Sequence, residues 1–549
     1  MRHDPRTTLD RPASHGVQAR AGMHAVHVAP TTHVVRGMPP LRSAARLAAA
    51  IPAAVVMLAA GSARADDLWV ATDGVDAADR GSTDRPLATL QAAADRVNPG
   101  DVVHVRDGAY VGFDLRRGGT EGAPVTFVAE GSAVHIDRPG PAGRGFNVEG
   151  VEYVVIEGFE VSGATAAGAR CAESRFVTFR RIVSHDNGTG GTYTGIFSGC
   201  CGDMVIEDST SYGNTEHGIY FSNSGDDSRI SGNHCYDNRG GGIQVNPDLS
   251  IECTAVTTDG ISSRLVIERN RLHGNGTAGG AGLNLMGLED AVVANNLVYG
   301  NHAGGLTLYQ GEAAAAPVRT LVINNTIVMP EDGRWAINIR DGAHDIVLRN
   351  NIVVTAHAFR GLVNLAGATA TGDHNLYWPM GARFSAMDEE SPVDLAAWTT
   401  MGQESDSAYA DPATLFVDPA TGDFDLLASA SAAIDHGSAD RAPSSDFEGR
   451  ARPAGAGVDI GAYESGAAPG MDAGSVPGMD AGAFRDAEVP HDDVDLPTTD
   501  ASSRSDAGAG GGGGGCGCVV AGTTDRAHLA LWASSVLGLA LARRRRRRT

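Results

Sequence analysis

The feature that most constrains the fold is a short apolar strand that recurs along the middle of the chain. Segments such as VVIEGFEV, LVIERNRL and LVINNTIV place equivalent apolar residues 23 to 37 positions apart, from Ile156 to Leu348. A period of this length with β-branched content is typical of a solenoid in which each repeat is one coil. Leucine-rich repeats have a similar period, but they need a regular leucine pattern that these Gly- and Asn-rich units lack.

A second strand recurs inside each unit and predicts an exposed face. It starts with Gly–Ile, Gly–Leu or Ala–Ile, continues with one variable residue, and returns to an apolar residue in most units. This alternation turns the variable residue outward and its neighbours inward. Stacked coils, spaced by about 4.8 Å, then form continuous parallel sheets. The outward residues form one predicted row: Phe197, Tyr220, Gln244, Asn284, Thr307 and Asn338.

Asparagines gather at the turn between the two strands. Asn tolerates left-handed backbone, and its side-chain amide can bond to the same residue of the next coil. We therefore interpret these residues as a scaffold ladder rather than a functional site. They are Asn233, Asn270 and Asn296, with Asn295, Asn325 and Asn350 one place earlier.

The repeat resembles that of the pectate-lyase-like superfamily, which implies an all-β fold, a right-handed parallel β-helix solenoid with an N-terminal capping helix. Residues 68–111 resemble the start of such proteins, where a strand, a Gly/Asp loop, a capping helix and a first coil follow in order. A cap is needed because an open solenoid end exposes core and strand edges. Asn98-Pro99-Gly100 would end the helix, whose apolar face comprises Leu87, Leu90, Ala93, Ala94 and Val97.

The N-terminal end of the chain predicts export. Arg42 and Arg46 precede an apolar run, and Ala63-Arg64-Ala65 has the form of a signal-peptidase site. We expect residues 1–65 to be a leader and signal peptide, with the true start at Met38 or, as the alternative, Met23.

The C-terminal end predicts surface display. Cys516-Gly517-Cys518, an apolar stretch and a run of arginines resemble the MYXO-CTERM class of sorting signals. This resemblance implies transient membrane anchoring, a sorting protease as partner, and a protein anchored at the cell surface or released.

Three further segments complete the predicted organisation. We assign residues 66–365 to the β-helix and residues 366–465 to a C-terminal cap, in which residues from about 412 to 464 resemble a choice-of-anchor Q module. Residues 466–515 are a Gly/Asp/Pro-rich linker with too few large apolar residues to fold. Residues 516–549 are the sorting signal.

The net charge of the mature chain limits the kinds of partner that it can bind. Residues 66–515 keep 28 arginines and 63 acidic residues, a net charge of about −35, which argues against nucleic acid as a partner. We expect a monomer.

No cysteine pair in this part has metal-binding C-x-x-C spacing, and an oxidising compartment favours disulfides. We predict Cys235 with Cys253, and Cys171 with Cys200 or Cys201.

The predicted outward row suits an extended sugar chain, because amides pair with hydroxyls and aromatic faces stack on pyranose rings; an ordinary solvated sheet is the alternative. A long loop after the third strand of this row carries Asp248 and would wall the same face. The expected partner is an extracellular polysaccharide. The substrate-binding prediction comprises Phe197, Gln244, Asn246, Asp248, Asn284, Thr307, Gln310 and Asn338.

The resemblance implies β-elimination of a polyuronate, which needs a group that neutralises the carboxylate, a base and an acid. The chain has no lysine, so a lysine base is excluded. The catalytic candidates are His217, Tyr220, Tyr309 and Arg340. His217 as a turn residue bonded to backbone is an equally supported interpretation. A non-catalytic binding or structural solenoid and a glycoside hydrolase remain as alternatives.

Asp226 and Asp227 are adjacent carboxylates on a predicted turn. They either cap backbone amides or bind Ca²⁺, the one cofactor that the sequence suggests.

Overall fold

The structure, a computed structural model, describes residues 65–191, 193–223, 226–256, 259–358, 361–387 and 391–466. The predicted leader, most of the linker and the sorting tail lie outside the described residues. The chain divides into two units, Met1–Pro469 and Gly470–Thr549, and everything described belongs to the first.

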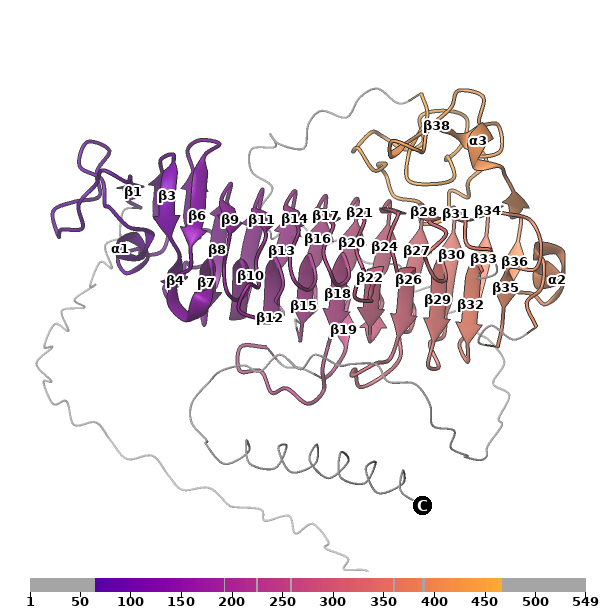
Figure 1. Cartoon of the computed structure of the whole chain (residues 1–549), viewed down its shortest axis with the longest axis horizontal. Helices are drawn as coiled ribbons and strands as arrows, with labels where there is room; N and C mark the ends of the chain where they lie inside the picture. Colours follow the sequence, from indigo (N-terminus) through magenta and orange to yellow (C-terminus); the bar gives the residue numbers. More distant parts are fainter. Residues whose placement is uncertain are drawn as a thin grey trace, which may run out of the picture. The chain divides into compact units, whose positions relative to one another are not determined.

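The described chain is a parallel β-solenoid, as the sequence predicted, with three strands in each full coil (Figure 1). We name the three sheets face A, face B and face C. Face A holds the predicted second strands with the outward row, and face B holds the predicted first strands. Face C was not predicted, because its strands are mostly three residues long and begin directly after an asparagine or a turn residue.

The strand bounds follow the three faces. Face A comprises β4 (Phe113–Leu115), β7 (Phe146–Glu149), the first half of β10 (Ala169–Arg180), β12 (Ile196–Gly202), β15 (Ile219–Ser222), β18 (Ile243–Asn246), β22 (Ala281–Met286), β26 (Gly304–Tyr309), β29 (Ile337–Arg340), β32 (Val363–Ala366) and β35 (Phe384–Ser385). Face B comprises β1 (Asp67–Val70), β2 (Val102–Val105), β5 (Val125–Ala129), β8 (Glu152–Glu157), the second half of β10, β13 (Val205–Glu207), β16 (Arg229–Ser231), β20 (Val266–Glu268), β24 (Val292–Ala294), β27 (Leu321–Ile323), β30 (Ile346–Arg349), β33 (Ala370–Asp373) and β36 (Glu404–Ser405). Face C comprises β3 (Gly108–Val111), β6 (Val134–Arg138), β9 (Glu160–Ser162), β11 (Val183–His185), β14 (Thr210–Tyr212), β17 (His234–Tyr236), β21 (Arg271–His273), β25 (Leu297–Tyr299), β28 (Thr326–Met329), β31 (Ile352–Thr355), β34 (Leu376–Trp378) and β37 (Ala408–Tyr409).

Outside these sheets, β19 (Ser262–Ser263) pairs with β23 (Leu288–Glu289), and β38 (Phe416–Asp418) pairs with β39 (Asp423–Leu426). The described helices are short: α1 (Leu90–Ala94), α2 (Leu395–Thr400), α3 (Pro412–Leu415) and one 3₁₀ turn (Pro141–Gly143). Within the described residues, no helix has the length and apolarity needed to cross a membrane.

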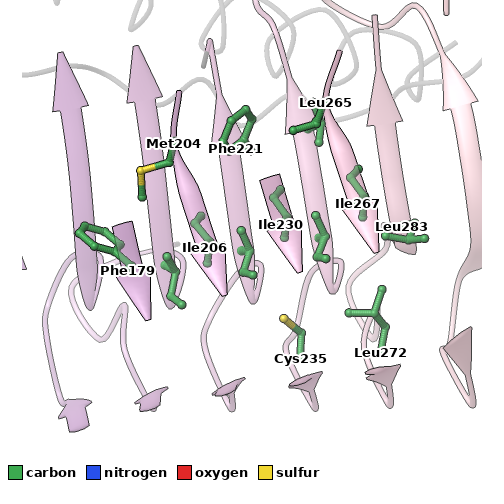
Figure 2. Packing of buried hydrophobic residues seen from close by; sticks show 14 of the residues in the cluster. Phe179, Met204, Ile206, Phe221, Ile230, Cys235, Leu265, Ile267, Leu272 and Leu283 are labelled. Carbon is green, nitrogen blue, oxygen red and sulfur yellow. The ribbon is translucent and has the colours of Figure 1, made fainter. Parts of the chain in front are cut away.

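The core runs inside the coils as rows of equivalent apolar side chains (Figure 2). Ile206, Ile230 and Ile267 are in register on β13, β16 and β20 and have no exposed surface. Face C contributes Cys235 and Leu272 to the same interior. Because each coil contacts mainly its neighbours, the stacked rows bury a continuous core that no single coil could form.

A ladder of buried asparagines joins the coils between faces B and C. Each side-chain oxygen accepts hydrogen bonds from the backbone N–H and the amide of the preceding asparagine, as Asn270 does from Asn233 at 3.0 Å each. The members are Asn233, Asn270, Asn296, Asn325, Asn351 and Asn375. The ladder therefore exists. The predicted Asn325 is a member, at the position that matches Asn296, and Asn351 rather than Asn350 is the next member.

The asparagines before the ladder have another role. Asn295 and Asn350 adopt φ of 52° and 54°, the left-handed backbone that turns the chain into the ladder position. A second ladder between faces C and A was not predicted. Its members are Asn187, Asn214, Asn238, Asn275 and Asn301.

The two ends of the solenoid are covered. At the N-terminal end, α1 is capped by Thr89, and the predicted apolar face of Leu87, Leu90, Ala93, Ala94 and Val97 is buried. At the other end the coils continue beyond residue 365 as far as β37. Residues after α3 pack a separate apolar cluster, including Phe416 and Phe424, against the outer side of face C.

Replacing Asn270 by alanine tests the ladder. The change removes the acceptor of the Asn233 N–H and of one Asn233 amide hydrogen, and the side-chain donor to the carbonyl of Ile230, so we expect a loss of about 2–4 kcal/mol in the free energy of unfolding. Urea denaturation measures this. Asn338→Ala is the matched control, because that half-exposed side chain accepts one bond from Asn364 and should cost below about 1 kcal/mol. Equal losses in both variants would contradict a structural role for the ladder.

Candidate functional site

The outward row of face A is in register, as predicted. Pairing of successive strands aligns each residue with the next, and the row continues to Arg170 before Phe197 and to Asn364 after Asn338. Its members are Arg170, Phe197, Tyr220, Gln244, Asn284, Thr307, Asn338 and Asn364. A second outward row lies two residues further along the strands and includes Ser222, Asn246, Met286, Tyr309 and Arg340.

Side-chain amides link the two rows. Asn246 donates from Nδ2 to the Tyr220 hydroxyl at 3.0 Å and to Glu312 Oε2 at 2.9 Å. Asn284 donates from Nδ2 to Gln244 Oε1 at 2.5 Å and to the Tyr309 hydroxyl at 2.8 Å. The groups predicted to bind sugar are therefore held in fixed orientations by one another.

Exposure divides this surface into two parts. Tyr220, Gln244 and Asn246 are only 4–6 % exposed although they point away from the core. On the following coils, Asn284, Thr307, Tyr309 and Asn338 are half-buried and Arg340 is exposed. The accessible part of the two outward rows thus runs from β22 to β29.

The long loop after β18 lies beside the closed part. A disulfide joins Cys253 to Cys200 on β12, with Cα atoms 5.4 Å apart. Glu173 Oε2 accepts hydrogen bonds from the N–H groups of Thr254 and Ala255 at 2.7 and 2.9 Å. The loop is therefore fastened across earlier coils, over the strands that carry Phe197 and Tyr220.

This disulfide corrects the predicted pairings. Cys235 points into the core between coils and cannot reach Cys253, and Cys171 is buried inside face A. Sequence spacing could not show that the loop folds back by two coils.

Two residues that were predicted to bind substrate, Asp248 and Gln310, form hydrogen bonds within the loops instead. Asp248 Oδ1 accepts from the Ser250 N–H at 2.8 Å, and the Asp248 N–H donates to Asn223 Oδ1 at 2.6 Å. Gln310 donates from Nε2 to the carbonyls of Ala313 and Ala314.

His217 lies in the turn before β15, with its ring centroid 5.4 Å from that of Tyr220. Its Nδ1 accepts the Gly241 N–H at 2.8 Å, which assigns the remaining proton to Nε2. Burial lowers the pKa of His217 to about 4, so the ring is neutral at pH 7. The hydrogen bond to backbone is the one expected for the turn interpretation.

Glu216, the residue beside His217, was not among the predicted site residues. Its Oε1 lies 3.9 Å from His217 Nε2, and its buried Oε2 has no hydrogen-bond partner among the described residues. Burial raises the pKa of Glu216 to about 7, which suits a group that exchanges protons near neutral pH. Its place in a turn gave no period-2 signal, so the alternation rule could not select it.

The four predicted catalytic residues form two groups. His217 and Tyr220 are together at the closed part, whereas Tyr309 and Arg340 lie on adjacent strands of the open part. Tyr220 and Tyr309 are three coils apart, or about 14 Å at 4.8 Å for each coil. They can contact one polysaccharide but not one glycosidic bond.

Burial raises the pKa of Tyr309, and hydrogen bonds with Gln244 and Asn284 and the charge of Arg340 oppose that increase. Proton transfer by the Tyr309 hydroxyl would therefore depend on those three neighbours.

The predicted calcium ligands are paired with a cation. Arg264 donates from Nε to Asp227 Oδ1 at 2.7 Å and from Nη2 to Asp226 Oδ2 at 3.0 Å. Asp226 Oδ1 also accepts the Ser263 N–H at 3.0 Å. Arg264 thus neutralises much of the charge that would attract Ca²⁺, and calcium binding here stays a prediction.

Glu216→Gln tests the buried carboxyl. A folded-state pKa raised from 4.5 to about 7 means that the protonated form stabilises the fold, so this contribution is full below pH 4.5 and is lost as the pH rises through 7. The difference in unfolding free energy, variant minus wild type, should therefore increase by about 3 kcal/mol between pH 4.5 and pH 8. Urea denaturation at both values measures it. A difference that does not change with pH would contradict the burial of an ionisable Glu216.

Residues 68–329 match the family model described as "Pel9A-like, right handed beta helix region". No curated protein matches. Among solved structures, pectate lyase Pel9A is 17 % identical over 72 % of this chain and 96 % of its own, with a TM-score of 0.49. A rhamnogalacturonan lyase is 16 % identical over 56 % of this chain and 87 % of its own, with a TM-score of 0.43.

An alginate lyase from Paenibacillus sp. str. FPU-7 is 18 % identical over 54 % of this chain and 94 % of its own, with a TM-score of 0.36. Three parallel faces, with a matching family region over residues 68–329, identify the folded part of the chain as a right-handed β-helix.

Proposed function

We propose that the protein is an exported, surface-anchored β-helix that binds an extracellular polysaccharide along the open part of face A and degrades it by β-elimination of a polyuronate. The observation that carries this proposal is the pairing of two groups on adjacent coils. The Tyr309 hydroxyl is held by Asn284 at 2.8 Å, and the exposed Arg340 follows in the same outward row.

These residues supply two of the three groups that the reaction needs, the cation and one proton-exchanging hydroxyl. Arg340 donates from Nε to Asp341 Oδ1 at 3.1 Å, and its guanidinium can also pair with a uronate carboxylate, which makes the C5 proton easier to remove. Tyr309 is the hydroxyl that can exchange a proton with the sugar, and its position is fixed by Asn284. Thr307 and Asn338, half-buried in the floor, offer hydroxyl and amide groups to sugar hydroxyls.

The residues of the closed part of the outward rows have a different role. Tyr220 is only 6 % exposed, and His217 uses its Nδ1 lone pair for the Gly241 N–H, so neither is placed to take a C5 proton in this arrangement. We assign them to positioning the rows. Glu216 is the remaining proton-exchanging group at that end.

A non-catalytic carbohydrate-binding solenoid is the second candidate. The observation that favours it is the burial of Tyr220 together with the bond of His217 to backbone. Binding along the rows without cleavage would need only the amides and hydroxyls that the structure already holds in place.

A polysaccharide panel with Tyr309→Phe separates the two. A lyase releases unsaturated products from at least one polyuronate, and we expect this rate to decrease by 10²–10⁴-fold in Tyr309→Phe while binding of the polymer is kept. Tyr212→Phe on face C is the matched control and should keep full activity. Assays with and without Ca²⁺ test the calcium prediction.

Two outcomes would overturn the proposal. Binding without cleavage of any acidic or neutral glycan would leave the non-catalytic candidate. Cleavage that is unchanged in both Tyr309→Phe and Arg340→Gln would place the active site elsewhere.

A further inference from the structure

Face C carries a cluster of side chains of the metal-ligating type, away from the outward rows of face A. His135 on β6, Glu160 on β9 and His185 on β11 come from three successive coils. His135 is in register with Glu160, and His185 lies two residues further along the next strand. One ligand atom from each residue lies within 4.8 Å of those of the other two, and all three side chains are half-buried.

The contacts of His185 favour a cation in the cluster. Its Nδ1 is 2.8 Å from Asp186 Oδ2, and its Nε2 is 3.1 Å from Glu160 Oε1. A neutral imidazole has one N–H, so it can donate to only one of these two carboxylates. The second contact is satisfied by a second ring proton or by a metal ion between Nε2 and Glu160, and with the metal Asp186 would hold the Nδ1 proton as an outer-shell partner.

The ring of His185 is already oriented for this role. It stacks on Tyr212 with ring centroids 4.7 Å apart and an angle of 2° between the planes. His135 completes the set from the preceding side, where its Nε2 lies 2.7 Å from Ser162 Oγ. Ligand atoms bound to one divalent ion at about 2.0–2.2 Å are roughly 3–3.5 Å apart, so the separation between His185 and Glu160 needs no change.

The donor set selects the class of ion. Two imidazole nitrogens and one carboxylate suit Zn²⁺ and other first-row divalent metals, whereas Ca²⁺ and Mg²⁺ prefer oxygen ligands alone. The half-buried position leaves room for water as a further ligand. Beyond Tyr212 the row continues as stacked rings at Tyr236, His273 and Tyr299.

We propose that His135, Glu160 and His185 form a binding site for a divalent first-row transition metal, with Zn²⁺ as the expected ion, that ties together three coils of face C. This site is independent of the proposed function on face A.

Titration calorimetry of the chelator-treated protein with Zn²⁺, together with thermal unfolding, tests the proposal. We expect one equivalent of Zn²⁺ to bind at these residues and to raise the melting temperature, and Ca²⁺ to have no such effect. His135→Ala and His185→Ala should each weaken this binding at least tenfold. His344→Ala, at an exposed turn, is the matched control and should bind as wild type does.

A second pair of histidines makes the test specific. His234 and His273 face each other on the same sheet, with Nε2 atoms 2.8 Å apart. Zn²⁺ binding that is lost in His273→Ala but kept in His135→Ala and His185→Ala would overturn the proposal, as would no binding by the wild type. Circular dichroism of each variant checks that the fold is intact, and Glu160→Gln, which keeps the shape of the side chain, supplies a further variant if a histidine change prevents folding.

Discussion

The asparagine ladders are the interaction on which the rest of the structure depends. Every coil must turn between faces, and each turn leaves backbone N–H groups that would be buried without partners. In the ladder between faces B and C, each asparagine accepts the N–H of the previous coil's asparagine and donates to a carbonyl of that coil, as Asn270 does to Ile230. Repetition of these bonds fixes the register of one coil on the next, and the register fixes everything outside the core.

Register turns a variable sequence position into a surface. Because Gln244, Asn284 and Thr307 occupy the same position in three coils, their side chains stand in one row at the spacing of the coils. The same mechanism places His135 beside Glu160 on face C. Functional residues that lie side by side in such a fold therefore come from successive coils, and they are 20 to 40 positions apart in the sequence.

Much of the solenoid could be predicted because its signals are periodic. The apolar alternation identified faces A and B, and the capping helix followed from Leu90 and the Asn98-Pro99-Gly100 stop. Face C was missed because strands such as His234–Tyr236 are too short for alternation to show. The ladder position of Asn351 was missed because Asn350 and Asn351 are adjacent and only the backbone conformation distinguishes them.

The site was less predictable for a physical reason. Which part of the outward row is accessible depends on a loop that departs from the repeat, and the Cys200–Cys253 bond that fastens it was not predicted. The loop moves the accessible surface from Tyr220 toward Tyr309. The unusual pKa of Glu216 likewise follows from its burial in a turn, and local sequence does not determine burial there.

The structure of the protein bound to an oligouronate tests the central claim, that face A holds an acidic sugar chain between β22 and β29. We expect a sugar carboxylate on Arg340, a hydroxyl or ring oxygen near the Tyr309 hydroxyl, and further sugars along Thr307 and Asn338. A chain bound on face B or face C, or one that contacts neither Tyr309 nor Arg340, would contradict it.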